Sequence, residues 1–251
     1  MSNNIIFERG QMANKPNNYL WNGDCLELMK DIPDEYVNLI VTDPPYKTTS
    51  RGSSGGTGGI LKEELNKKGK VFRYNTISFD EWLPECYRVL KNNSHAYFMT
   101  NNKNLKDMII SVEKAGFSIF KTLIWVKNTA ITNMYYMDSH EYIIFCRKGK
   151  AKKINNCGTK SVLNYNNPKN KKHPTEKPID LLTVLIENST DINDIVLDPF
   201  VGCGSTTIAS YNSDRFSIGI ELDIDFYNVA KKRVEKNILL RANEQQTLFK
   251  Q

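Results

Sequence analysis

The stretch IVLDPFVGCGSTTIAS, from Ile195 to Ser210, contains an apolar run, an acid, a glycine-rich turn and the start of a helical pattern. Similar apolar runs alternate with amphipathic segments along the chain, from YLWNG near its beginning to SIGIEL near its end. Strands that alternate with helices predict a mostly parallel sheet covered by helices on both faces. The sequence therefore predicts an α/β fold, with this turn at the carboxyl end of a strand.

The composition is that of an ordinary globular domain. The 251 residues are enough for one large domain, 1–251, and 40% of them are hydrophobic and 25% charged. The beginning of the chain lacks the apolar region of a signal peptide, and the apolar runs are too short to cross a membrane. The five cysteines are scattered without a CxxC pair, which argues against disulfides or a zinc site. We therefore expect a cytoplasmic protein with no membrane association and no metal.

Positive charge is concentrated in one part of the chain. The net charge is +6, yet ten Lys and Arg residues lie between Arg147 and Lys177 against Glu176 alone, a local balance of +9. This basic block predicts a docking surface for a polyanion. A solvated loop is the alternative interpretation of the same charges.

The glycine turn predicts a cofactor site. Gly202 and Gly204 would let the backbone pass close to a ligand. Their spacing is neither GxGxxG nor GxxxxGK[ST], which disfavours a dinucleotide or a nucleoside triphosphate. Glu221 ends the next apolar run, where an acid can accept hydrogen bonds from ribose hydroxyls. Two acids around a glycine turn suit a ligand with an ammonium group and a ribose but no phosphate, such as S-adenosylmethionine. A tight turn alone is the alternative, which the flanking DPF, STT and IELD disfavour.

A second motif, VTDPPY, follows another apolar run and ends at Tyr46. Pro44 and Pro45 stiffen the backbone and remove two amide donors, which leaves the Asp43 carboxylate and the Pro44 carbonyl as acceptors. Tyr46 adds a flat aromatic face. Two acceptors beside a stacking surface suit the exocyclic amino group of a planar heterocycle. For this motif alone, a proline-rich turn with Asp43 as a helix cap is the alternative.

Together these motifs resemble those of the amino-group DNA methyltransferases that use S-adenosylmethionine. DPPY matches the family's catalytic D/N/S-P-P-Y/F/W motif, and DPFVGCGST looks like its cofactor motif, F-x-G-x-G. HPTEKP, from His173 to Pro178, looks like the element that precedes the cofactor motif. The catalytic motif comes first, which is the permuted order called the β class. The resemblance covers about Tyr19 to Leu240 and implies a Rossmann-like methyltransferase fold with a seven-stranded sheet.

The resemblance also implies roles for single residues. Its catalytic residues would be Asp43, Pro44, Pro45 and Tyr46. Cys203 stands where another small residue is common, and the chain lacks the Pro-Cys pair that C5-cytosine methylation uses. The implied cofactor-binding residues are Asp198, Phe200, Gly202, Gly204 and Thr206 along the pocket, Glu221 at the ribose, Asp24 near the adenine, and Thr175 and Lys177 near the methionine end.

The expected reaction is methyl transfer to N6 of an adenine in double-stranded DNA. The base must flip out of the duplex to reach a buried pocket. Asp43 and the Pro44 carbonyl would then hold N6 while Tyr46 stacks on the ring, and the nitrogen would attack the methyl group in line. Residues 47–78 are expected to form a mobile DNA-facing loop, and residues 128–172 a target-recognition insert.

Other functions fit parts of the pattern. N4-cytosine methylation uses the same chemistry, although similar enzymes for cytosine more often carry serine in place of Asp43. RNA or protein-glutamine methylation uses a similar corner, often with asparagine first. A catalytically silent DNA-binding subunit would keep the fold without the reaction. The resemblance is also compatible with a homodimer and with a cognate restriction endonuclease.

Overall fold

The computed structural model describes residues 5–7, 17–45, 77–131, 135–150, 152–169 and 176–248. Two of the expected site residues, Tyr46 and Thr175, and residues 47–76 of the expected DNA-facing loop lie outside the described residues. The end of that loop, Ser78, caps helix α3 (Phe79–Val89), because its backbone N–H donates to the Glu81 carboxylate at 2.6 Å.

Nine strands of the described residues form one sheet, in the order β1-β2-β9-β8-β3-β4-β6-β5-β7. Neighbours from β1 to β4 run parallel, whereas β6 runs antiparallel to both β4 and β5. The expected mostly parallel sheet is therefore confirmed. The resemblance implies seven strands, whereas the described residues form nine. The two shortest of the nine, β1 and β7, have only two and three residues. The strands are β1 Ile5–Ile6, β2 Asn18–Asn22, β3 Val37–Thr42, β4 Leu90–Thr100, β5 Ser118–Ile131, β6 Asp138–Lys148, β7 Val162–Asn164, β8 Ile195–Asp198 and β9 Phe216–Glu221.

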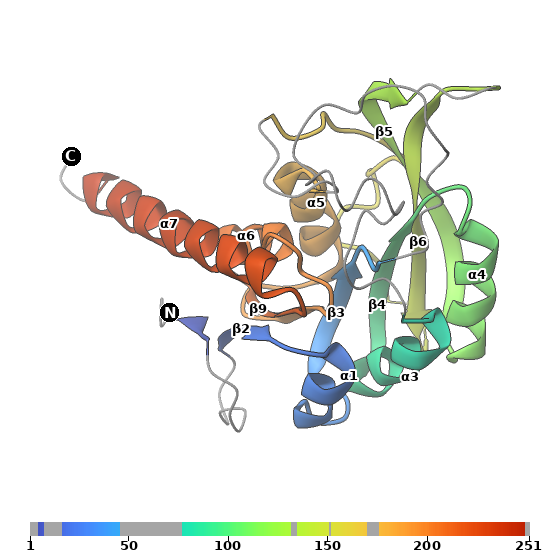
Figure 1. Cartoon of the computed structure of the whole chain (residues 1–251), viewed down its shortest axis with the longest axis horizontal. Helices are drawn as coiled ribbons and strands as arrows, with labels where there is room; N and C mark the ends of the chain where they lie inside the picture. Colours follow the sequence, from blue (N-terminus) through green and yellow to red (C-terminus); the bar gives the residue numbers. More distant parts are fainter. Residues whose placement is uncertain are drawn as a thin grey trace.

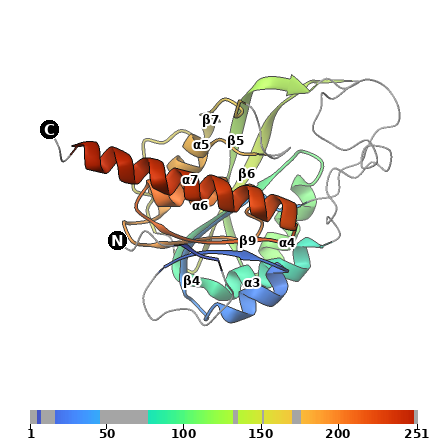
Figure 2. The same ribbon diagram turned by 60° about the vertical axis from the view of Figure 1, so that its left-hand side comes forward.

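Helices cover both faces of the sheet, as the alternating pattern predicts. Figures 1 and 2 show α1, α3 and α4 on one face and α5, α6 and α7 on the other, with α7 extending well beyond the sheet. Among the described residues, no helix is both long and apolar enough to span a membrane. Besides α3, the helices are α1 Cys25–Leu28, the 3₁₀ helix η1 Met29–Asp31, α4 Leu105–Lys114, α5 Ile179–Ser189, α6 Ser205–Asn212 and α7 Ile224–Leu248.

The core lies in two layers because successive strand residues point to opposite faces. On β4, Ala96 and Phe98 pack in the cluster that contains Trp82 of α3. Tyr97 and Met99, which alternate with them, pack in the cluster on the α5 side of the sheet. A strand that is buried on both faces reads as a continuous apolar run, which is why the sequence shows such runs.

The order in which successive strands are added to the sheet reverses between β3 and β8. These strands pair in parallel, with Ile40 opposite Leu197. From β3 the chain continues through α3 to β4 on one side, and from β8 through α6 to β9 on the other. In open α/β sheets, ligands bind outside the carboxyl ends of the strands at such a reversal.

The expected recognition segment, 128–172, is not a separate insert over its whole length. Asp138–Lys148 forms β6, which pairs with β4 and β5 in the body of the sheet. Lys148 belongs to the basic block, yet it is buried and donates to the carbonyls of Tyr87 and Leu90. A count of charges cannot distinguish such a lysine from one that faces solvent.

We expect Phe98→Ala to lower the free energy of unfolding by about 3–5 kcal/mol, because it opens a cavity in the core. Phe98 is fully buried and packs edge-on against Trp82 and Phe117. The matched control is Phe120→Ala, where the ring is 65% exposed, and its effect should be about 1 kcal/mol or less. Urea unfolding followed by circular dichroism measures both, and equal losses would contradict the placement of the core.

Candidate active site

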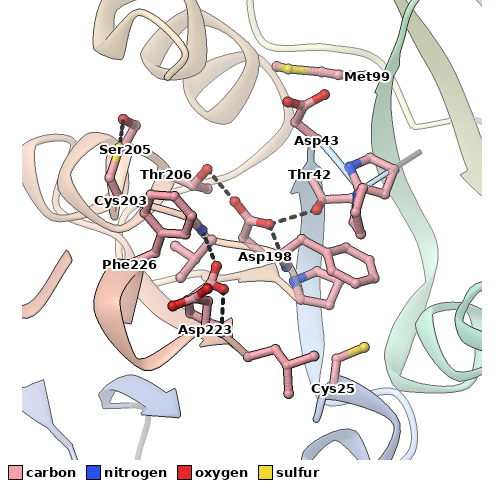
Figure 3. Close-up of a pocket in the computed structure, with 18 of the residues that line it drawn as sticks. Cys25, Thr42, Asp43, Met99, Asp198, Cys203, Ser205, Thr206, Asp223 and Phe226 are labelled. Atoms are coloured by element: carbon pink, nitrogen blue, oxygen red, sulfur yellow. Dashed lines mark hydrogen bonds between the residues drawn. The ribbon is translucent and has the colours of Figure 1, made fainter. Parts of the chain in front are cut away.

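A cavity of about 310 Å³ opens where four neighbouring parallel strands end. β2 is followed there by Asp24 and β3 by Asp43, while Asp198 and Glu221 are the last residues of β8 and β9. Figure 3 shows Asp43 and Asp198 close to Thr42, the last residue of β3. The volume suits a small organic ligand. The lining residues are Gly23, Asp24, Cys25, Leu26, Thr42, Asp43, Pro44, Pro45, Ile77, Glu81, Met99, Glu176, Lys177, Leu182, Asp198, Pro199, Phe200, Val201, Gly202, Cys203, Ser205, Thr206, Glu221, Leu222, Asp223 and Phe226.

Asp43 directly follows the last residue of β3, so the buried strand fixes where its carboxylate enters the cavity. One oxygen, Oδ2, accepts a hydrogen bond from the Lys177 ammonium. The other, Oδ1, is buried and has no hydrogen-bond partner among the described residues. Burial raises the pKa of Asp43, and the positive charge of Lys177 opposes that rise. A buried acceptor without a partner fits a ligand that brings a donor.

Asp198 is held rigidly by its neighbours. Thr42 and Thr206 each donate a hydroxyl to one of its oxygens at 2.6 Å, and the backbone N–H of Phe200 donates at 3.1 Å. Burial raises the pKa of Asp198 to about 6, although these hydrogen bonds oppose the rise. The dashed lines in Figure 3 mark this set of contacts.

The glycine turn and Glu221 are tied to each other. The backbone N–H groups of Gly202 and Asp223 donate to the two Glu221 carboxylate oxygens at 2.9 and 2.8 Å. Burial raises the pKa of Glu221 to about 7, while the two amide bonds oppose the rise. Gly202 has a φ of 55° and Gly204 a φ of 86°, both in the left-handed region that favours glycine. Glu221 therefore fixes the turn as well as facing the cavity.

Asp24 begins a helix at the rim of the cavity. It is exposed, and its side chain accepts from the backbone N–H of Leu26 at 2.9 Å as the N-cap of α1. The preceding Gly23 donates its N–H to the Glu221 carbonyl at 3.0 Å. The first short helix is thus fastened to the end of β9.

Lys177 lies inside the site and is only 7% exposed. Its ammonium group pairs with Asp43 and lies 3.4 Å from the Glu141 carboxylate. Burial alone would lower the pKa of Lys177, but the carboxylates of Asp43 and Glu141 outweigh burial and raise it. Lys177 therefore carries its charge within the cavity, although it belongs in sequence to the basic block.

Cys203 takes part in a further buried contact. Arg233 of α7 donates to the Cys203 carbonyl at 2.7 Å and to Glu176 at 2.6 Å. Burial raises the pKa of the Cys203 thiol to about 11, so the thiolate is scarce at neutral pH.

In the part of the chain that the structure describes, no cluster of His, Cys, Asp and Glu could hold a metal ion.

The cavity brings together most of the residues that the sequence singles out. Gly204 is different, because it is not among the lining residues and instead starts α6. A Cβ added to Gly204 would lie 3.2 Å from Val234 and 3.3 Å from Ala230 of α7. The expected residues that line the cavity are Asp24, Asp43, Pro44, Pro45, Lys177, Asp198, Phe200, Gly202, Thr206 and Glu221.

Sequence reasoning missed several lining residues. Leu26 and Asp223 lie just after Asp24 and Glu221, so their closeness to predicted strand ends was a usable signal. Met99 had no such signal, because within its strand it looks like any other core residue. Glu141 does not line the cavity but contacts Lys177, and the distance between them in sequence hides this contact.

Comparison with known proteins gives consistent results. The family model described as DNA methylase matches residues 37–232, which is most of the chain. The chain is 31% identical over 247 residues to the type II methyltransferase M.HinfI of Haemophilus influenzae, covering 87% of this chain and 68% of that protein. It is 33% identical over 216 residues to the putative methylase YubD of Escherichia coli, covering 84% and 88%.

Solved structures are similar as well. The crystal structure of the M1.HpyAVI–SAM complex matches with a TM-score of 0.64 and 27% identity, covering 84% of this chain and 97% of that one. The cytosine-N4-specific PvuII DNA methyltransferase matches with a TM-score of 0.66 over 89% of this chain and 92% of that one. At 15% identity, this second likeness shows the fold alone.

We expect the free energy of unfolding to fall as the pH rises, in part because of Glu221. Its pKa is raised from 4.5 to about 7, so the folded state binds the proton more tightly. That stabilisation is complete below about pH 4.5 and is lost as the pH passes through about 7. Glu221→Gln should remove this part of the slope, which is at most about 1.4 kcal/mol per pH unit.

Urea unfolding between about pH 5 and pH 8 measures the slope for both proteins. Asp198, whose pKa is also raised, contributes to the slope of both proteins. Because its charge raises the pKa of Glu221, the difference between the two slopes includes the interaction of this pair. Parallel pH profiles for the wild type and Glu221→Gln would contradict the assignment.

Proposed function

The chain belongs to the DNA methylase family, and on this premise we propose that its target is N6 of an adenine flipped out of duplex DNA. It is an S-adenosylmethionine-dependent DNA methyltransferase with a Rossmann-like α/β fold. The order of its motifs, with DPPY before the glycine turn, is the basis for assigning it to the permuted β class.

The observation that best supports the proposal is that Asp43 and the glycine turn share one cavity. Asp43 follows β3, and Asp198 ends the neighbouring parallel strand β8, next to the turn. A pocket for the methyl donor and an acceptor for the target amine therefore lie side by side. Positioning two reactants in this way can supply a large part of a rate enhancement.

The residues around the cavity fit S-adenosylmethionine. Asp198 and Glu221 offer carboxyl groups whose ionisation burial disfavours, and a cationic or hydroxyl-bearing ligand beside them would favour the ionised form. Phe200 and Phe226 offer apolar faces for the adenine, and Asp24 lies on the rim. When bound, S-adenosylmethionine supplies an electrophilic methyl group.

The DPPY corner would hold the target base. The unpartnered Oδ1 of Asp43 would accept one N–H of the amino group, and the Pro44 carbonyl the other. These bonds hold the nitrogen so that its lone pair points along the line of attack. Tyr46 would stack on the ring, worth roughly 1–3 kcal/mol. Asp43 acts as a fixed acceptor that stabilises positive charge developing on the nitrogen.

Adenine is favoured over cytosine by one residue. The first position of the DPPY motif is aspartate, whereas the resemblance associates serine more often with N4-cytosine enzymes. N4-cytosine methylation remains the second candidate, because a carboxylate and a carbonyl can hold either amine.

The basic block supports a DNA-binding role for the exposed parts of 128–172. Its exposed lysines could meet phosphates, and Tyr135 and Tyr136 are 81% and 90% exposed near the β6 end of the β5–β6 connection. Residues 47–78 would contribute a second contact. A homodimer, a cognate restriction endonuclease and a cytoplasmic location complete the proposal. The exposed lysines are Lys150, Lys152, Lys153, Lys160 and Lys169.

We expect Asp43→Ala to lower the single-turnover rate of methyl transfer by about 100- to 1000-fold, because it removes the acceptor that stabilises the developing charge. The matched control is Asp34→Ala, since Asp34 is 76% exposed and pairs only at the surface with Arg88. That control should keep the wild-type rate. Unchanged turnover in Asp43→Ala would remove Asp43 from the catalytic residues.

The test of the whole proposal is methyl transfer from radiolabelled S-adenosylmethionine to unmethylated genomic DNA, followed by nucleoside analysis. The expected product is N6-methyladenine, and mapping it would give the recognition sequence. N4-methylcytosine would keep the mechanism but overturn the target base. Cofactor binding without any label in DNA would favour RNA, protein or a silent DNA-binding subunit.

A further inference from the structure

Four charged side chains of alternating sign form a continuous buried row behind the DPPY corner. Lys127 of β5 pairs with Glu141 of β6, Glu141 with Lys177, and Lys177 with Asp43. Lys177 is 7% exposed at its side chain, and each of the other three is 14% exposed. Trp125 lies beside the row, with its ring 5.1 Å from the Lys127 ammonium and 5.9 Å from that of Lys177.

The row is electrically balanced, with two cations and two anions. Buried charges are tolerated when each is paired, and removal of one partner leaves the others uncompensated. Burial alone would raise the pKa of Glu141, but the two lysines outweigh burial and lower it. Glu141 is therefore ionised, and its carboxylate attracts the Lys177 ammonium at 3.4 Å.

We infer that Lys127, Glu141 and Lys177 position the catalytic carboxylate. Lys177 binds Oδ2 of Asp43, and Oδ1 is left buried and without a partner among the described residues. Oδ1 is then the atom that accepts the N–H of the target amine. Glu141 and Lys127 act through Lys177, so they are positioning residues and do not touch the substrate. This inference rests on the proposed function of Asp43.

The same geometry gives Lys177 a role other than the cofactor contact that the resemblance implies. Two carboxylates already surround its ammonium group. The carboxylate of S-adenosylmethionine would be a third anion around one cation, and the row would lose its balance. The contacts therefore favour Lys177 as the partner of Asp43.

The test is the single-turnover rate of methyl transfer from radiolabelled S-adenosylmethionine to unmethylated genomic DNA, measured against pH. Glu141→Gln should lower the rate by about 10- to 100-fold, as loss of a supporting group does at other sites. Its affinity for S-adenosylmethionine, from calorimetry, should stay near the wild-type value, because Glu141 does not line the cavity.

The pH profile separates positioning from a merely structural role. The charged groups that face Asp43 are Lys177, Glu141 of β6, Lys127 of β5 and Asp198 of β8. Glu141→Gln removes a negative charge, so the acidic limb of the rate should move to lower pH. Lys177→Met removes a positive charge, so the same limb should move to higher pH.

The matched control is Glu35→Gln. Glu35 also pairs with a buried lysine of β6, Lys148, at 3.3 Å, but lies away from the cavity. Its rate and acidic limb should match the wild type. If Glu141→Gln does not fold, Lys127→Gln tests the same row, and its acidic limb should move to higher pH.

Three results would overturn the inference while the wild type still methylates DNA. The first is a wild-type rate and acidic limb in Glu141→Gln. The second is a lower rate with an unchanged acidic limb, which would give Glu141 a structural role only. The third is a Lys177→Met enzyme with much weaker S-adenosylmethionine binding but a normal rate at saturating cofactor. No methyl transfer by the wild type would instead overturn the proposed function.

Discussion

The parallel pairing of β3 with β8 is the constraint on which the rest of the site depends. It places Thr42 against Asp198, and the hydroxyl of Thr42 donates to the carboxylate across 156 residues of sequence. The chain moves to opposite sides of the sheet after these two strands, and the described residues leave a cavity beyond their carboxyl ends. Asp43 and the glycine turn, which we propose hold the amine and the cofactor, face that same space.

Three carboxyl groups at this edge of the sheet are stabilised in three different ways. Hydroxyl groups hold Asp198, backbone amides hold Glu221, and an ammonium group holds Asp43. The three carboxyl groups therefore differ in the chemical type of their hydrogen-bond donor. Burial raises the pKa of all three carboxyl groups, and the hydroxyls, the amides and the ammonium group each oppose that rise by favouring the ionised form. The fold can therefore place several acids around one cavity and give each a separate task.

The sequence predicted those features that depend on neighbouring residues. The β-like run before DPPY and the run before the glycine turn are local patterns, and both form strands that end at the cavity. Pairings between distant segments could not be predicted in this way. The sequence groups Lys177 with nearby basic residues, and the resemblance places it near the cofactor, yet the structure pairs it with Asp43 and Glu141. Gly204 matches the cofactor motif, but the structure shows that α7, which comes later in the chain, leaves little room for a side chain there.

The pairing of β3 with β8 also has a consequence for folding during synthesis. During synthesis, β3 and β4 leave the ribosome long before β8. The edge of β3 that pairs with β8 therefore stays unpaired with it until β8 has emerged. Contacts of such sequence separation form slowly, because a long loop must close before they contribute. A nascent or truncated chain that lacks β8 therefore has an acceptor corner without a cofactor turn. A chain at that stage of synthesis has only one of the two parts that methyl transfer would need.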